Sequence, residues 1–324
     1  MKNNQSPLIS IVMLNYNGLK YLKRTIPPIL KLNYPNFEFI VVDNGSTDGS
    51  LEFVESLSGI KLIKSPKARE KNFACNYAIE KARGLYILLL DNDCLITNTD
   101  LLDELLHMAK TLDNFGSIGL AYFNEGYDKT MEYGAFLSYF FGKNKKNINI
   151  EKVKDINGIP IGYAQGTGLF ISKLTWQIVG GYDSHLKFGG DDNDLGIKLW
   201  LYGYKNYLYS NTLQIHIGTP ERRDNKKFSL KFEEIFRAHL YTTVKNFGFI
   251  NMILILIGQT LYMFFESVKL SIRRMYIRYF FAFFCGFFSF LKDLPYAIEK
   301  RREIQSKRIV KEDIFLKINP PSIK

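Results

Sequence analysis

The chain has 324 residues, enough for one large domain or for one domain with an appendage, and 46% of them are hydrophobic. The formal net charge is +11, and basic side chains interleaved with Phe, Tyr and Ile are concentrated between Glu266 and Glu312. This region suits an anionic membrane surface or nucleic acid. The three cysteines lack ligand-type spacing, which argues against a disulfide framework and favours reduced thiols.

Strand-like and helix-like segments alternate in the first part of the chain. Short apolar runs bounded by polar residues predict strands at residues 9–14, 37–42, 60–63 and 86–90. Helices are expected at 19–32, where Pro27 and Pro28 must kink or end the helix, and at about 48–57, 69–82 and 99–112. The alternation predicts an α/β fold with a doubly wound, mostly parallel sheet, whose strand ends line one crevice.

The middle of the chain is less regular. Residues 124–159 are rich in Asn, Lys and Gly and predict an irregular insertion, after which order resumes at 164–171. A helix is expected at 191–202 with three acids in its first turn, and a favourable interaction with the helix dipole explains these acids when taken alone. The last of them, Asp194, lies four residues before Lys198, which predicts an ion pair within the helix.

The composition changes after about residue 228. Residues 249–265 and 279–291 form apolar runs, and the segment between them carries Lys269, Arg273, Arg274 and Arg278. A spanning helix needs about 20 apolar residues, so the first run is marginal and the second is too short. A buried helical pair fits this pattern, but Phe at this density beside Arg favours a membrane-associated hairpin, either spanning or lying in the interface. We therefore expect a catalytic part at 1–228 and a helical, membrane-associated part at 229–324.

An acidic triplet, Asp91-Asn92-Asp93, directly follows the apolar run 86–90. Side chains at i and i+2 of an extended segment point the same way, and these lie where open α/β sheets hold ligands. Two such carboxylates suit Mg²⁺ or Mn²⁺ and the phosphates that the ion carries. A solvated turn is the alternative, because Asp and Asn are common turn residues.

Four pieces of the sequence, in this order and spacing, together resemble glycosyltransferase family 2. They are residues 10–18 (SIVMLNYNG), residues 39–50 (FIVVDNGSTDGS), the triplet 91–93, and residues 180–183 (GGYD) with 190–195 (GDDNDL) and 201–204 (LYGY). The resemblance covers roughly residues 8–218. It implies the GT-A fold and transfer of a sugar from a nucleotide sugar with inversion at the anomeric carbon.

The resemblance also implies roles for individual residues. Expected contacts to the nucleotide sugar are Asn15, Tyr16, Asp43, Arg69, Asn76, Asp91 and Asn92. Expected ligands of Mg²⁺ or Mn²⁺ are Asp93, His216 and Asp91. The alternatives are a turn-stabilising role for Asp43, an exposed helical face for Arg69 and Lys71, and a structural role for His216. The match is loose around residues 72–74, where the family's usual glycine is missing.

Asp192 is the expected catalytic base, because it matches the second acid of the family's Glu/Asp-Asp motif. With an ordinary pKa near 4, its carboxylate is ionised at neutral pH and can accept the proton of the attacking hydroxyl. Asp191, Gly166 and Thr167 are expected to contact the acceptor, although a plain turn also explains Gly166 and Thr167.

The family's processive members carry a Gln-x-x-Arg-Trp motif, and neither Trp176 nor Trp200 follows an arginine. We therefore expect addition of a single sugar. Residues 238–246 (AHLYTTVKN) and the basic tail 300–305 resemble rhamnosyltransferase-like members. That resemblance implies a lipid-linked or cell-surface glycan acceptor at the cytoplasmic face of the cell membrane.

The expected function is thus a metal-dependent, inverting, non-processive glycosyltransferase, with a UDP-sugar as the default donor. An inactive nucleotide-sugar-binding protein is the first alternative, although it would lack the acids that are present here. A nucleic-acid-binding protein is a further alternative, but the sequence contains no recognisable nucleic-acid-binding motif. We therefore expect no nucleic acid partner. A nucleotidyltransferase would show a Gly-rich phosphate loop after the first strand, and residues 15–18 (NYNG) do not form one.

Overall fold

The computed structural model of the chain describes residues 6–125, 131–132, 137, 156–187, 189–218 and 224–318. Its strands are β1 (Ile9–Asn15), β2 (Phe37–Asp43), β3 (Ile60–Lys64), β4 (Tyr86–Asp91), β5 (Cys94–Leu95), β6 (Phe115–Asn124), β7 (Met131–Glu132), β8 (Pro160–Ile161), β9 (Gly168–Ser172) and β10 (Lys205–His216). Its helices are α1 (Leu19–Ile29), α2 (Ser50–Glu55), α3 (Lys71–Lys81), α4 (Leu101–Thr111), α5 (Lys173–Val179), α6 (Asp191–Leu201), α7 (Asn225–Asn246), α8 (Phe249–Arg274), α9 (Arg278–Ser306) and the 3-10 turn η2 (Ile314–Lys317).

The described strands form one sheet in the order β3-β2-β1-β4-β9-β6-β10-β5. In addition, β7 pairs with β6 and β8 pairs with β10. Strands β3, β2, β1 and β4 are parallel, β9 runs antiparallel to both of its neighbours, and β6 is parallel to β10. The predicted doubly wound, mostly parallel α/β fold is confirmed. In register, Asn15 lies opposite Asp43 and Leu14 lies opposite Asp91, so three strands end at nearly the same level.

Helices cover both faces of this sheet, because residues along a strand alternate between the faces. Ile9, Ile11 and Met13 of β1 pack in a core with residues of α1 and α4. Val12 of the same strand packs on the other face, in a core that includes residues of α3, α5 and α6. Burial on both faces explains why these strands are almost wholly apolar.

The four predicted strands of the first part are confirmed within one residue at each end. The helix expected at 19–32 ends at Ile29 and contains Pro27 and Pro28 in its last turn. Strand β6 was not predicted. The insertion expected at 124–159 lies largely outside the described residues.

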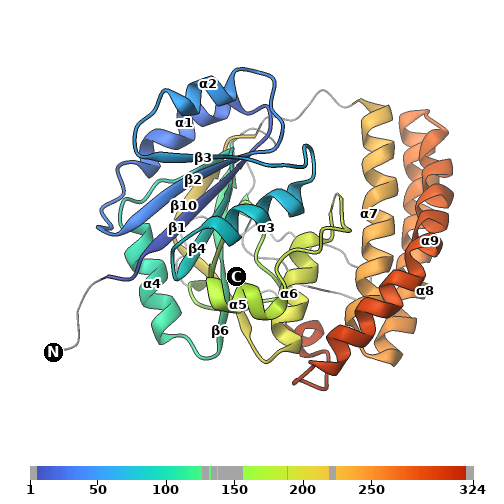
Figure 1. Cartoon of the computed structure of the whole chain (residues 1–324). Coiled ribbons are helices and arrows are strands. Elements are labelled where there is room, and N and C mark those ends of the chain that lie inside the picture. The colour runs from blue at the N-terminus through green and yellow to red at the C-terminus, as the bar shows by residue number, and fades with distance from the viewer. Residues whose placement is uncertain are drawn as a thin grey trace.

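The C-terminal helices stand side by side next to the sheet, with α7 nearest to it (Figure 1). Both α8 and α9 are longer than the apolar runs within them, at 26 and 29 residues, and by length and composition alone each could cross a membrane. The division expected between residues 228 and 229 falls in the first turns of α7.

Candidate active site

Amide side chains link the ends of three parallel strands. The Nδ2 of Asn92 donates to Oδ1 of Asn15 at 2.8 Å, and the Nδ2 of Asn15 donates to Oδ1 of Asp43 at 3.2 Å. The other oxygen of Asp43 accepts the backbone N–H groups of Gly45 and Ser46, each at 3.0 Å. The carboxylate of Asp43 therefore stabilises the turn after β2, as the alternative interpretation expected, and keeps lone pairs for a further donor.

Two side chains at this edge of the sheet reach solvent. Tyr16 is 39% exposed, and the guanidinium of Arg69 lies over its ring at 5.6 Å from the centroid. Arg69 has a backbone φ of 62°, a left-handed conformation that costs energy in a non-glycine residue. This stacked pair stands next to the turn of Asp43, because the backbone N–H of Arg69 donates to the carbonyl of Asn44 at 2.9 Å.

Lys71 opens α3 and is surrounded by carboxylates. Its Nζ lies 3.1 Å from Oδ2 of Asp191. Although burial opposes it, the charges of Asp191, Asp91 and Asp192 raise the pKa of Lys71 well above its usual value. Burial and the carboxylates of Asp93 and Asp192 raise the pKa of Asp91 to about 7, against the opposing charge of Lys71. Lys71 thus stabilises the charged acids of the site.

Asp192 is held by two hydrogen bonds. Its Oδ2 accepts the backbone N–H of Gly166 at 2.9 Å, and its Oδ1 accepts the hydroxyl of Tyr182 at 3.0 Å. Burial and the neighbouring Asp191 raise the pKa of Asp192, whereas Lys71 and the two hydrogen bonds lower it. The expectation of an ordinary pKa is therefore wrong. A pKa nearer to the working pH makes a carboxylate a stronger general base.

The predicted base and the predicted acceptor residues lie around one cavity of about 380 Å³. Its lining residues are Asp91, Tyr122, Tyr163, Gln165, Gly166, Thr167, Gly189, Gly190, Asp191, Asp192, Asn193, Ile235 and His239. A Cβ atom on Gly166 would lie 3.0 Å from Oδ1 of Asp192 and 3.2 Å from Nζ of Lys71. Glycine at this position therefore lets the backbone approach both charged groups.

Asp93 and His216 meet beside this cavity, with Oδ2 of Asp93 3.1 Å from Nε2 of His216. The Nδ1 of His216 lies 2.7 Å from Oδ1 of Asn124, which as an acceptor requires a proton on Nδ1. A neutral ring then turns the lone pair of Nε2 toward a carboxylate oxygen, an arrangement that a cation between them satisfies. No group of three or more His, Cys, Asp and Glu that could hold a metal is found among the described residues.

Asn76, an expected contact to the nucleotide sugar, is bonded to the backbone of Tyr182. Its Nδ2 donates to the carbonyl of Tyr182 at 2.8 Å, and its Oδ1 accepts the backbone N–H of Tyr182 at 3.1 Å. The side chain thus fixes the loop that carries the Tyr182 hydroxyl to Asp192. Sequence reasoning quoted Tyr182 within a motif without giving it a role, and it missed Asn124 as the partner of His216.

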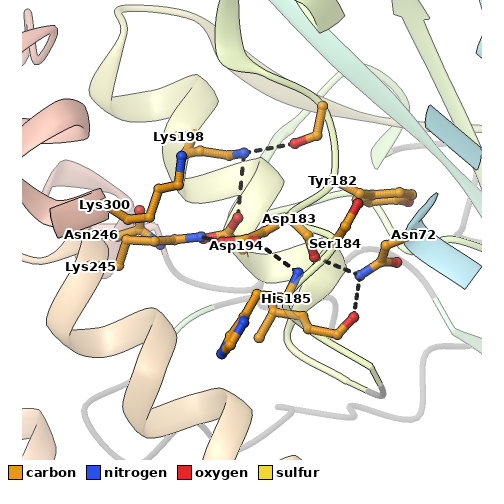
Figure 2. Close-up of polar contacts among 12 residues, drawn as sticks. Asn72, Tyr182, Asp183, Ser184, His185, Asp194, Lys198, Lys245, Asn246 and Lys300 are labelled. Atoms are coloured by element: carbon orange, nitrogen blue, oxygen red, sulfur yellow. Dashed lines mark hydrogen bonds and ion pairs between the residues drawn. The ribbon is translucent and has the colours of Figure 1, made fainter. Parts of the chain in front are cut away.

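The same loop is tied to the C-terminal helices by buried charges (Figure 2). The Nζ of Lys245 on α7 lies 2.5 Å from Oδ2 of Asp183 and 2.8 Å from Oδ1 of Asp194. The predicted pair of Asp194 with Lys198 is present at 3.4 Å, and Lys198 also donates to the carbonyl of Gly181 at 2.7 Å. We call Asp183, Asp194, Lys198 and Lys245 the charge cluster.

Residues 10–164 match the model of the family described as Glycosyl transferase family 2. An "Uncharacterized glycosyltransferase" of Haemophilus influenzae is 40% identical over 108 residues, which are 32% of this chain and 43% of the relative. The "Putative teichuronic acid biosynthesis glycosyltransferase TuaG" of Bacillus subtilis is 33% identical over 94 residues, 28% of this chain and 37% of the relative. The chain thus spans less than half the length of these two relatives, and the matches support family 2 for its first part.

Solved structures resemble the chain over most of its length. The mannosyltransferase PcManGT of Pyrobaculum calidifontis, in complex with GDP-Man and Mn²⁺, superimposes with a TM-score of 0.56 at 13% identity, covering 90% of this chain and 88% of that one. TarS 1–349 of S. aureus in complex with UDP-GlcNAc gives 0.60 at 15% identity, covering 95% and 90%. The chain has a GT-A-like glycosyltransferase fold. At these identities the likeness concerns the fold alone.

Proposed function

We propose that the chain is an inverting, metal-dependent, non-processive glycosyltransferase. It moves one sugar from a nucleotide sugar, by default a UDP-sugar, to a lipid-linked or cell-surface glycan at the cytoplasmic face of the membrane. The observation that carries the proposal is the placement of Asp192, which Gly166 and Tyr182 hold at the wall of a cavity shared with Asp91. The family match and the fold support it.

In the proposed reaction the acceptor hydroxyl oxygen forms a bond to the anomeric carbon from the side opposite the diphosphate. Its proton passes to the carboxylate of Asp192, and the nucleoside diphosphate leaves with the electrons of the broken bond. The charge of Lys71 opposes protonation of Asp192 before the acceptor arrives. Asp191, Gly166 and Thr167 also line this cavity and would contact the acceptor there.

The donor would lie along the strand ends. Tyr16 and Arg69 offer a stacking surface for the base, and the edge formed by Asn15, Asp43 and Asn92 offers hydrogen bonds to the nucleoside. Asp93 and His216 fit Mg²⁺ or Mn²⁺, with Asp91 as a further carboxylate. When bound, such an ion neutralises charge on the departing diphosphate.

The test is a mass-detected transfer assay with a panel of nucleotide sugars and Mn²⁺ or Mg²⁺. Asp192→Asn keeps the size of the side chain and removes the base, so we expect transfer to fall by about 10²- to 10⁴-fold while donor binding persists. Asp103→Asn, on the exposed surface of α4, is the matched control and should transfer normally. Near-full turnover of Asp192→Asn would refute the assignment of the base. Donor binding without transfer by the unmodified protein would favour the inactive binding protein.

A further inference from the structure

The helix α8 exposes an apolar face that nothing in the described chain covers. Its buried side chains, Ile255, Gln259, Met263 and Ser267, recur every four residues and face the bundle. On the opposite side Ile250, Ile253, Leu254, Ile257, Leu261, Phe265 and Ile272 are each more than 40% exposed. In the turn before the antiparallel α9, and in α9 itself, the surface continues with Ile277, Phe281, Phe284, Phe288 and Leu291. We call these twelve side chains the apolar face. Soluble monomers rarely expose contiguous apolar surface on this scale.

The charges around the apolar face identify its partner. Lys269, Arg273, Arg274 and Arg278 gather where α8 turns into α9, and Glu266 is the one acid between residues 249 and 292. Apolar side chains bordered by cations match a lipid leaflet with anionic headgroups. A second copy packed in parallel on this face would bring the same cations against one another, which is unfavourable.

The packing of the bundle decides between the two orientations that the sequence left open. Helix α9 contacts α7 along its length. Near the start of α9 the ring of Phe283 stacks on that of Phe236, with the ring centroids 5.0 Å apart. Toward the end of α9, Nη1 of Arg301 donates to the carbonyl of Phe247 at 2.6 Å. The start of α8 is also fastened to the body of the protein, because Asn251 donates to Asp313 at 2.7 Å.

Helix α7 cannot enter hydrocarbon together with these neighbours. It carries Arg237, paired with Asp293 of α9, and its other side contributes Ile235 and His239 to the candidate active site. A bilayer crossed by α8 and α9 would therefore have to displace α7 and the catalytic part beside it (Figure 1). Charged side chains and polar loops at that depth are costly.

We propose that the apolar face lies in one leaflet of an anionic membrane, with α8 parallel to the surface, and that neither α8 nor α9 spans the bilayer. The inference stands on packing and charge and is independent of the proposed chemistry. Helices of this kind sit about 5–10 Å below the headgroup boundary. The cavity lined by α7 then opens at a fixed height above the lipid.

Depth-dependent quenching tests the orientation in the full chain. Ile250→Trp, Ile257→Trp and Ile272→Trp place probes at the start, middle and end of the exposed side, while the native Trp176 and Trp200 are buried and give a constant background. With vesicles containing phosphatidylglycerol and lipids brominated at shallow or deep positions, we expect all three probes at one shallow depth. A deep middle probe between two shallow ends would show a spanning helix and overturn the proposal.

Binding to vesicles tests the surface itself, with no sugar donor present. Replacing Leu254, Leu261 and Phe265 together by Glu should weaken flotation with phosphatidylglycerol vesicles by at least about tenfold. In the control, Leu85 and Leu174 are replaced by Glu in the same way. These two side chains are 65% and 66% exposed on the catalytic part, and the control should float like the unmodified chain. Equal flotation of both variants overturns the proposal. The proposal is also overturned if light scattering shows that the unmodified chain is a dimer and that the triple variant alone is a monomer, because the apolar face would then join two copies.

Discussion

Replacing Lys245 by Met removes one of the two cations of the charge cluster and preserves the length of its side chain. Lys245 is 1% exposed and pairs with Asp183 and with Asp194, which is itself fully buried. Lys198 would remain as the one cation for both carboxylates, at 3.4 Å from Asp194. Breaking a buried pair by removing one partner costs about 3–5 kcal/mol, because an uncompensated charge stays behind. We expect Tm to fall by roughly 5–15 °C.

The pH dependence of this loss follows from the same contacts. Burial alone would raise the pKa of Asp183, but Lys245 and the hydrogen bonds from His185 and Tyr241 lower it well below its ordinary value. In the unmodified protein this depressed pKa adds stability above pH 4, which is lost as the pH falls further. Without Lys245 the pKa of Asp183 should rise. The loss of stability caused by Lys245→Met should therefore be smaller at pH 5 than at pH 7.

Thermal or urea unfolding at pH 7 and pH 5 measures both effects, and a second substitution provides the control. Lys245→Met with Asp183→Asn removes one charge of each sign, so the double variant should recover at least half of the lost stability. Because Asp183 adjoins Tyr182, which bonds to Asp192, the single variant should also lower transfer at temperatures where it is folded. A stability loss below about 1 kcal/mol, or no recovery in the double variant, would refute the reasoning.

Four further substitutions address the candidate active site. Asp93→Asn and His216→Ala should each weaken Mn²⁺ affinity by about 10- to 100-fold, measured by titrating transfer against the metal, and unchanged affinity would place the metal elsewhere. Gly166→Ala should lower kcat about tenfold with unchanged Tm, because its Cβ would come within 3.0 Å of Asp192; normal kcat would show that the carboxylate moves freely. Lys71→Gln removes a charge that lowers the pKa of Asp192, so the acidic limb of the pH–rate profile should move to higher pH; an unmoved limb would separate Lys71 from the base.

The local pattern of apolar residues was sufficient to predict those strands that are buried on both faces. The strands β1 to β4 are apolar because both faces are covered, and their ends could be placed from the polar residues that follow. The pair of Asp93 and His216 was predicted by resemblance, and its separation of 123 positions along the chain shows why spacing alone would not have joined the two residues. Asn124, which orients His216, ends a strand that the sequence did not predict.

Charged residues that stabilise one another across the fold were harder to predict. Lys71 looked equally like an exposed helical residue, because nothing near it in sequence shows that Asp191 lies 3.1 Å away. Lys245 had no predicted role, and its two carboxylates come from a loop and from α6. Such contacts depend on how elements distant in the sequence pack together, which no local periodicity encodes.

Helix α7 serves two neighbours at once, since Ile235 and His239 line the cavity while Phe236 and Tyr241 pack with α9 and its surroundings. The C-terminal helices are therefore not an interchangeable anchor. A chimera that joins the first part of this chain to another relative's helices would also exchange one wall of the cavity. Where such helices diverge between relatives, the choice of acceptor should diverge with them, even if every residue of the donor site is retained.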